Sequence, residues 1–270
     1  MNNKKYASLF DLSGKTAIVT GGMGILGKCF CAGLAEFGAN VAIIDLDEVS
    51  AMAYANKLSS LYNIGAIGIG CDISSPEAVK TSVQNVIDEF GGIHILHNNA
   101  QGETASVSFE ECTLEQWKMT AAVNEDGYFL MAQAVGEYMV RQKLGGSIIQ
   151  TSSIYGIMGP DHRIYQDASY EGANMGTRAV YSFTKAGVVG LTKYLATYWA
   201  DKGIRVNTIT PGGVKSGQNE IFNQKYSERI PLGRMAKREE MVGALLYLAS
   251  NASSYVTGQN IIVDGGLDAW

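Results

Sequence analysis

The stretch KTAIVTGGMGILGKCFCAGLAEFGANVAIID (15–45) decides the fold. Two apolar runs within it, 15–20 and 40–45, have the length of strands and no polar face. Strands of this kind are typical of a parallel sheet that is covered on both sides. The segment between them, 28–39, has a helical pattern, and a strand, a helix and a second strand in this order form a parallel crossover unit.

The rest of the chain repeats this pattern. Further apolar runs of strand length lie at 65–70, 93–97, 147–152, 205–210 and 260–264. Helix-like segments separate them, and one of these, 75–91, has a serine cap, Pro76 in its first turn and a closing glycine. No linker or low-complexity segment interrupts the order. The sequence predicts one Rossmann-type α/β domain over 14–270, a doubly wound parallel sheet between two helical layers, preceded by an N-terminal extension, 1–13.

Three glycines, Gly21, Gly24 and Gly27, lie between the first run and the helix. Glycine allows a tight turn and a close approach to a pyrophosphate, and the helix N-terminus offers free N–H groups. Asp45 ends the second run about 18 residues later, where a carboxylate binds the adenine ribose and repels a 2′-phosphate. Because no arginine follows Asp45, the sequence predicts NAD in preference to NADP.

Polar residues also follow the third and fourth runs, at the sheet edge where this fold binds ligands. Asp72 follows the third run, and Asn98, Asn99 and Ala100 follow the fourth. We expect these residues to contact the cofactor. Two other roles stay open: Asp72 is also suited to capping a helix or turn, and the two asparagines to bridging backbone groups in a turn.

Tyr181 and Lys185 are four residues apart and therefore lie on one face of a predicted helix. A phenol with a pKa near 10 is a poor base at neutral pH. Lowering that pKa to 7 takes about 4 kcal/mol, which a cation about 4 Å away supplies at an effective dielectric of about 20. The pair is therefore a candidate proton donor and acceptor.

Together these motifs resemble the short-chain dehydrogenase/reductase family from about Gly14 to Gly266. The resemblance implies that Tyr181 is the general acid/base, that Lys185 lowers its pKa and holds the nicotinamide ribose, that Ser153 binds the substrate oxygen, and that Asn124 holds a water linked to Lys185. For Asn124, a purely helix-distorting role stays open. The further residues that it implies in the cofactor site are Met23, Ile25, Leu46, Ile73, Pro211, Gly212, Val214 and Ser216, with Tyr181 and Lys185 shared.

The chain departs from the family pattern in three places. Ile25 stands at the usual middle glycine, which gives TGxxGxxG, a spacing seen in the family's extended branch. Gln101 replaces the glycine that normally follows the Asn-Asn-Ala turn. Ser153 and Tyr181 are 28 residues apart, about twice the usual separation. None of these changes removes a catalytic group, but each alters the predicted pocket.

The extra residues fall in 156–178, which has neither helical nor strand periodicity. Both ends of this insert adjoin catalytic residues, so we expect it beside the substrate cleft, with Tyr165 and Tyr170 packing on a substrate face. Arg163 and Arg178 could each bind a carboxylate or phosphate. Its many polar groups favour a small polar substrate such as a sugar or sugar acid, and implicate carbohydrate metabolism. The alternative is that the insert is a contact loop between subunits.

Charge and composition exclude several other classes. The formal net charge of −5 does not favour binding to nucleic acid or to anionic membranes. No apolar run is long enough to span a membrane, and the start of the chain does not have the pattern of a secretory signal. The four cysteines form no CxxC pair, which is consistent with reduced thiols in the cytoplasm. The three histidines, His94, His97 and His162, have no metal-ligand spacing, so no metal is expected.

The sequence thus predicts an NAD-dependent oxidoreductase that transfers hydride between nicotinamide and a secondary alcohol or ketone. Two alternatives remain: a nucleotide-sugar epimerase or dehydratase, indicated by TGxxGxxG, and a protein that binds NAD without turnover. The family resemblance also implies pairing through the helices around Asn124 and Tyr181 and at the C-terminal segment 253–270. We expect a homotetramer, or otherwise a dimer.

Overall fold

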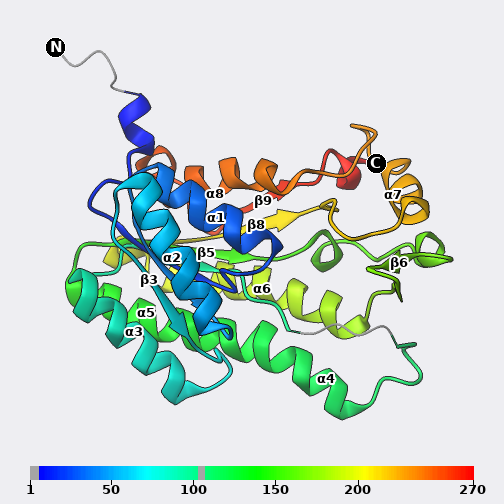
Figure 1. Cartoon of the computed structure of the whole chain (residues 1–270), viewed down its shortest axis with the longest axis horizontal. Helices are drawn as coiled ribbons and strands as arrows, with labels where there is room; N and C mark the ends of the chain where they lie inside the picture. The colour runs from blue at the N-terminus through cyan, green and yellow to red at the C-terminus, as the bar shows by residue number, and fades with distance from the viewer. Residues whose placement is uncertain (1–5, 103–106) are drawn as a thin grey trace.

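The computed structural model describes residues 6–102 and 107–270, so residues 1–5 of the predicted N-terminal extension lie outside the described residues. A seven-stranded parallel sheet forms its centre, in the order β3-β2-β1-β4-β5-β8-β9 (Figure 1). The strands are β1 (Thr16–Thr20), β2 (Asn40–Asp45), β3 (Ala66–Gly70), β4 (Ile95–Asn98), β5 (Gly146–Thr151), β8 (Ile204–Pro211) and β9 (Asn260–Val263). This arrangement confirms the predicted Rossmann-type fold, and each predicted run overlaps one of these strands.

Helices cover both faces of the sheet (Figure 1). They are α1 (Ile25–Glu36), α2 (Glu48–Tyr62), α3 (Pro76–Phe90), α4 (Leu114–Ala121), α5 (Tyr128–Gln142), α6 (Ala179–Tyr198), α7 (Glu220–Ser227) and α8 (Val242–Ala249). The ends of α3 follow the sequence signals, since the Ser75 side chain accepts from the Ala78 N–H and Gly91 is left-handed. None of the described helices is long and apolar enough to cross a membrane.

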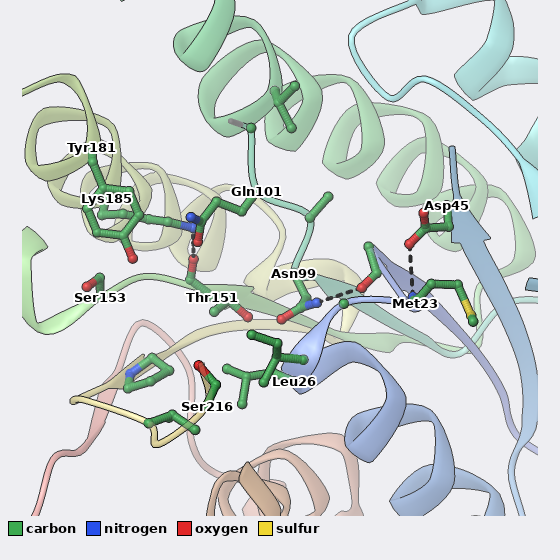
Figure 2. Close-up of a pocket in the computed structure, with 18 of the residues that line it drawn as sticks. Met23, Leu26, Asp45, Asn99, Gln101, Thr151, Ser153, Tyr181, Lys185 and Ser216 are labelled. Atoms are coloured by element: carbon green, nitrogen blue, oxygen red, sulfur yellow. Dashed lines mark hydrogen bonds between the residues drawn. The ribbon is translucent and has the colours of Figure 1, made fainter. Parts of the chain in front are cut away.

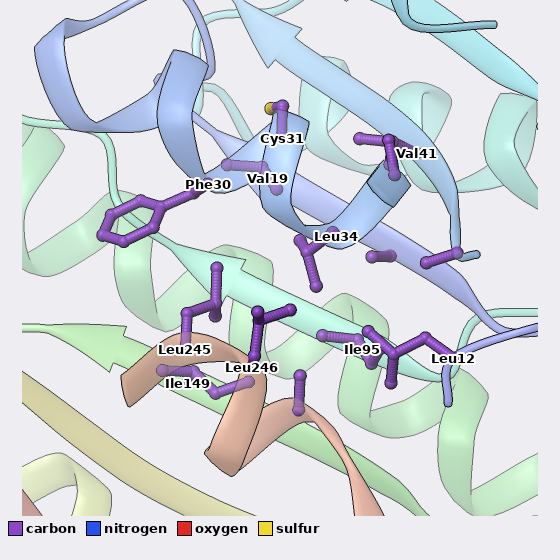
Figure 3. Close-up of a cluster of buried hydrophobic side chains, with 14 of the residues drawn as sticks. Leu12, Val19, Phe30, Cys31, Leu34, Val41, Ile95, Ile149, Leu245 and Leu246 are labelled. Atoms are coloured by element: carbon purple, nitrogen blue, oxygen red, sulfur yellow. The ribbon is translucent and has the colours of Figure 1, made fainter. Parts of the chain in front are cut away.

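The core explains why the strands are apolar on both faces. Val19 of β1 belongs to a cluster formed with α1, α2 and α8, whereas its neighbour Ile18 belongs to a second cluster with α3, α5 and α6. Adjacent residues of a strand point to opposite faces, so each strand contributes to both clusters. Figure 3 shows the first cluster, in which Leu12 of the predicted N-terminal extension is also buried.

The insert, 156–178, is more ordered than its sequence predicts. It contains a short 3-10 turn, His162–Tyr165, and a small hairpin formed by β6 (Ser169–Tyr170) and β7 (Ala173–Asn174). Its apolar residues pack in a third cluster with α7 and the C-terminal segment. Periodicity cannot reveal such a segment, because its order comes from contacts with residues far away in the chain.

The hairpin is also joined to the segment that follows β8. The Glu171 N–H donates to the Gly217 carbonyl at 3.0 Å, and the Asn219 N–H donates to the Ser169 carbonyl at 2.9 Å. The insert and residues 212–219 therefore form one continuous wall at the carboxyl ends of the strands.

Candidate active site

A cavity of about 1210 Å³ lies at the carboxyl edge of the sheet (Figure 2). It exceeds the size of an ordinary small-molecule pocket, about 300–1,000 Å³, and suits a dinucleotide together with a small substrate. The predicted site residues that line it are Gly21, Met23, Gly24, Ile25, Asp45, Leu46, Asp72, Ile73, Asn99, Ala100, Ser153, Tyr181, Lys185, Pro211, Gly212, Val214 and Ser216. Three predicted site residues, Gly27, Asn98 and Asn124, lie outside its wall.

The glycine loop fits a pyrophosphate. Gly21 has φ +61°, a left-handed conformation that side chains disfavour. A Cβ there would also lie only 2.6 Å from the Cα of Ala100, so there is no room for a side chain. Gly24 is the N-cap of α1, which leaves the first-turn N–H groups of residues 25–27 without partners in the helix. Gly27 is buried, and a Cβ on it would collide with the Gly21 carbonyl. Its role is therefore close packing of α1 against the loop rather than direct contact with a ligand.

Asp45 ends β2 inside the cavity. Its Oδ2 accepts a hydrogen bond from the Met23 N–H at 2.9 Å, which fixes the carboxylate against the glycine loop (Figure 2). Among the described residues that line the cavity, Lys185 is the only one with a cationic side chain. The region around Asp45 thus offers an acceptor for ribose hydroxyls and no lysine or arginine for a 2′-phosphate.

The other strand ends divide between binding and structure. Asp72 lines the cavity while its Oδ1 accepts from the N–H and hydroxyl of Ser74 at 2.9 and 2.7 Å, so it also caps a turn. Asn99 lines the cavity and its Nδ2 donates to the carbonyls of Thr20 and Gly21, both at 3.2 Å.

Asn98 does not reach the cavity. Its buried Nδ2 donates to the Tyr128 carbonyl at 3.1 Å and to Gln150 Oε1 at 2.9 Å. Asn98 therefore joins β4 to β5 and α5 and does not make the cofactor contact that we expected. Asn98 and Asn99 point in opposite directions because they are neighbours at the end of an extended strand.

Ser153, Tyr181 and Lys185 lie together at the end of the cavity opposite Asp45 (Figure 2). Lys185 is 1% exposed, and its Nζ donates to the Thr151 carbonyl at 3.0 Å and to the Tyr128 hydroxyl at 3.2 Å. Burial lowers the pKa of Lys185 to about 7. Its ammonium lies 5.9 Å from the centre of the Tyr181 ring.

The protonation states differ from the simple expectation for a tyrosine beside a cation. Burial raises the pKa of Tyr181, while a hydrogen bond with Ser153 lowers it by a smaller amount. Burial also means that Lys185 carries its charge in only part of the molecules at neutral pH. In this structure Tyr181 is therefore protonated at neutral pH, the form that donates a proton to a carbonyl oxygen.

Asn124 lies outside the main cavity, in a π-helical segment, Ala122–Gly127, between α4 and α5. Its Oδ1 accepts from the Gly102 N–H at 2.9 Å, and its Nδ2 donates to the Thr184 hydroxyl at 3.2 Å. It borders a separate cavity of about 180 Å³ with Tyr128 and Thr184. Asn124 thus lies in a distorted helical segment, and it also links α6 to the loop that follows β4.

The insert contributes to the cavity through its hairpin. Tyr170 and Asn174 line it, together with the neighbouring Gln218. Tyr165 does not, because its hydroxyl donates to that of Tyr155 at 2.9 Å within the third core cluster. Of the two tyrosines, only Tyr170 lies in the cavity wall, so the substrate contact stays a prediction for Tyr170 and is not supported for Tyr165.

Neither arginine of the insert lines the cavity. Arg163 is paired with Asp161, with both contacts at 2.8 Å, and its side chain is 89% exposed. Arg178 is buried at the N-cap of α6. The predicted anchors for a carboxylate or phosphate are therefore absent from the cavity wall, because local turn geometry pairs Arg163 with the acid two residues before it.

Several contacts were not predicted from the sequence. Tyr128 and Thr151 hold Lys185 through hydrogen bonds. Tyr128 follows Asn124 by four residues, but only its contact with Lys185 indicates its role. His97 is buried beside Thr151, with Nε2 and Oγ1 2.8 Å apart, and burial lowers its pKa to about 3. No group of potential metal ligands occurs within residues 6–102 and 107–270.

Comparison with known proteins places these features in context. The family model described as enoyl-(acyl carrier protein) reductase matches residues 23–268. The 3-oxoacyl-[acyl-carrier-protein] reductase FabG of Aquifex aeolicus is 33% identical, covering 95% of this chain and 98% of that protein. D-threitol dehydrogenase of Mycolicibacterium smegmatis is 34% identical, with 95% and 94% covered.

Two further similarities bear on the cofactor and the fold. The NADP-dependent mannitol dehydrogenase of Alternaria alternata is 35% identical, covering 96% of this chain and 94% of that protein. The crystal structure of a short-chain type dehydrogenase/reductase from Mycobacterium marinum superposes with a TM-score of 0.85 at 36% identity, with 97% and 98% covered.

Proposed function

Since the chain belongs to the short-chain dehydrogenase/reductase family of oxidoreductases, we propose that it is an NAD-dependent dehydrogenase acting on a secondary alcohol of a small polyhydroxy compound. One observation carries the proposal: a single cavity holds Ser153, Tyr181 and Lys185 at one end and the Asp45 carboxylate at the other. NAD accepts the hydride when it is bound.

The residues of the site have different roles in substrate binding and proton transfer. The hydroxyls of Ser153 and Tyr181 hold the substrate oxygen. In reduction, protonated Tyr181 donates its proton to the carbonyl oxygen. In oxidation, Tyr181 first releases its proton to solvent, and the phenolate then takes the proton of the alcohol. Lys185 Nζ is held by the Thr151 carbonyl and the Tyr128 hydroxyl, which directs it toward the Tyr181 ring. In its protonated form, Lys185 stabilises the phenolate that forms when Tyr181 gives up its own proton.

The preference for NAD rests on Asp45. A carboxylate fixed by the Met23 N–H accepts hydrogen bonds from the ribose diol, and it repels a 2′-phosphate that has no neighbouring cation to bind it. The mannitol dehydrogenase relative is NADP-dependent, whereas a similar crystal structure from Leptospira borgpetersenii contains bound NAD+. Kinetic measurement with both cofactors tests the preference.

The substrate class is inferred from the polar groups around the catalytic end. Gln101, Tyr170 and Asn174 line the cavity with side chains that can hydrogen-bond to substrate hydroxyls, beside apolar residues such as Met119, Val123 and Met175. We take the three polar side chains to favour a hydroxylated substrate over a plain alkyl chain. The similarity to D-threitol and mannitol dehydrogenases supports a polyol or sugar, whereas the similarity to FabG makes a 3-oxoacyl thioester the competing substrate.

The experiment is a panel of polyols, sugars and sugar acids with NAD, and of a 3-oxoacyl thioester with NADH, followed at 340 nm. We expect the highest kcat/KM for a polyhydroxy compound, and a kcat/KM about three orders of magnitude lower in the Tyr181→Phe variant. Activity on the thioester alone would contradict the substrate class. Binding of NAD without turnover of any compound would support the non-catalytic alternative, and turnover without net NADH would support an epimerase.

We further propose a homotetramer, or otherwise a dimer, in the reducing cytoplasm. Large apolar side chains are exposed on α5 and α6, among them Phe129, Phe183 and Tyr194. Faces of this kind mark sites of association. Sedimentation that gives a stable monomer of 28.9 kDa at micromolar concentration would refute the assembly.

A further inference from the structure

Gln101 places a long polar side chain in the catalytic end of the cavity. It lines the cavity together with Ser153, Tyr181 and Lys185, and Figure 2 shows it in the same part of the view as these groups. It stands where the family pattern has a glycine, so this side chain is an addition that neither the fold nor the proton transfer requires.

The backbone around Gln101 is fixed on both sides. The Ala100 N–H donates to the Thr20 hydroxyl at 3.1 Å, and the Gly102 N–H donates to Asn124 Oδ1 at 2.9 Å. Gly102 is itself buried beside Val123. The Cα of Gln101 is therefore held in place, and the side chain starts from a constant position on the cavity wall.

The side-chain amide of Gln101 has hydrogen-bonding capacity that the described part of the chain does not use. It is exposed, and no hydrogen bond joins its side chain to any residue within 6–102 or 107–270. A primary amide offers two donors and two acceptor lone pairs. Because it is uncharged, it matches a neutral hydroxyl, which both donates and accepts, better than it matches an ion.

Gln218 provides a useful contrast within the same cavity. Its Nε2 donates to the Val214 carbonyl at 3.0 Å, and its Oε1 accepts from the Ser216 N–H at 2.7 Å. Both ends of that amide are thus engaged in holding the segment after β8. Of these two cavity glutamines, Gln101 alone has its amide free for a ligand.

We propose that Gln101 is a specificity-determining residue that binds a hydroxyl on the carbon next to the reacting one. The enzyme then favours vicinal diols and α-hydroxy ketones over simple alcohols and ketones. This inference rests on the proposed function, since it concerns the substrate of the same site. It assigns Gln101 no part in proton transfer or in binding NAD.

The test compares 2,3-butanediol with 2-butanol, which lacks only the neighbouring hydroxyl, as substrates with NAD. For the wild type we expect the higher kcat/KM on the diol. Gln101→Leu should lower kcat/KM for the diol about tenfold, the equivalent of one lost hydrogen bond, and change that for 2-butanol less than about threefold. Gln101→Glu keeps the acceptors and should retain part of the preference.

Gln218→Leu is the matched control. Because its amide holds the wall rather than the ligand, this variant should affect both alcohols alike. The dissociation constant of NAD, measured by fluorescence titration, should be unchanged in Gln101→Leu.

Three results would overturn the inference: equal losses on both alcohols in Gln101→Leu, weakened NAD binding in that variant, or no preference for the diol by the wild type. The inference is also wrong if an enzyme that is active on the polyol panel oxidises neither 2,3-butanediol nor 2-butanol. A single neighbouring hydroxyl would then not be enough for recognition of the substrate. Failure of the whole panel would instead refute the proposed function.

Discussion

The two ends of the cavity are built in different ways. At the cofactor end, Gly21, Gly24 and Asp45 lie within 25 residues of sequence and are positioned by β1, α1 and β2 themselves. At the substrate end, the wall combines Gln101, the insert hairpin and residues 212–219, which come from three distant parts of the chain. Local backbone geometry therefore specifies the cofactor end, whereas long-range packing specifies the shape of the substrate pocket.

The strongest way to test this division is to remove the proton-transfer group alone. Tyr181→Phe should lower turnover by about three orders of magnitude, with NAD affinity changed less than about threefold, because the ring remains and only the hydroxyl is lost. Steady-state kinetics and fluorescence titration measure the two effects. A variant that kept more than about a tenth of the activity would remove Tyr181 from the acid/base role.

A second test addresses the cofactor end. Asp45→Ala should weaken NAD binding and relieve the repulsion of a 2′-phosphate, so the ratio of kcat/KM for NAD over NADP should fall about tenfold or more. Both values come from assays at saturating alcohol. Asp72→Ala is the comparison variant, since Asp72 also lines the cavity but is expected to leave the ratio unchanged. Equal use of NAD and NADP by the wild type would contradict the role given to Asp45.

A third test compares a residue of the insert that lines the cavity with one that lies on the surface. Asn174→Ala removes a cavity side chain and should raise KM for the alcohol severalfold with little change in kcat, as expected for a group that binds substrate and does not react. Arg163→Met lies outside the cavity and should leave both constants unchanged. If Arg163→Met instead altered the oligomeric state in sedimentation, the insert would belong to a subunit interface.

The smallest expected effect is on stability. Lys185 is buried and its pKa is lowered to about 7, so between pH 7 and its ordinary value of 10.5 the unfolded chain binds a proton that the folded chain does not. Stability therefore rises with pH across this window. Lys185→Met should abolish most activity yet raise the free energy of unfolding at pH 7 by about 1 kcal/mol or more.

The Lys185→Met variant should also flatten this pH dependence. The Thr151 carbonyl keeps its hydrogen bond from the Tyr128 hydroxyl at 3.1 Å, so the substitution leaves no unpaired acceptor there. Urea unfolding at several pH values provides the measurement. If the variant were less stable at neutral pH, the contacts of Lys185 would contribute more to the free energy of unfolding than the burial of its charge removes.

The contrast between the two ends also explains what could be predicted from the sequence. The seven strands follow from apolar runs, and the placement of Gly21, Asp45, Tyr181 and Lys185 follows from their positions at strand ends and on one helix face. Such signals are local, so they are visible without the fold.

Other details depend on neighbours far away in the chain. Asn98 and Asn99 are adjacent and chemically identical, yet one bonds to Gln150 inside the sheet and the other faces the cavity. Arg163 met the chemical requirements for an anion anchor but pairs with Asp161 on the surface. The hairpin in the insert depends on backbone partners near Gly217 and Asn219, which no local pattern reveals.

The most direct test of the central claim follows the hydride itself. A secondary polyol deuterated at the reacting carbon is incubated with NAD and the enzyme, and the released nicotinamide cofactor is analysed by mass spectrometry. We predict free NADH carrying one deuterium per molecule of ketone formed, and we expect the Tyr181→Phe variant to form it about a thousandfold more slowly. Ketone or epimer formed without release of deuterated NADH would contradict the assignment of this chain as an NAD-dependent dehydrogenase.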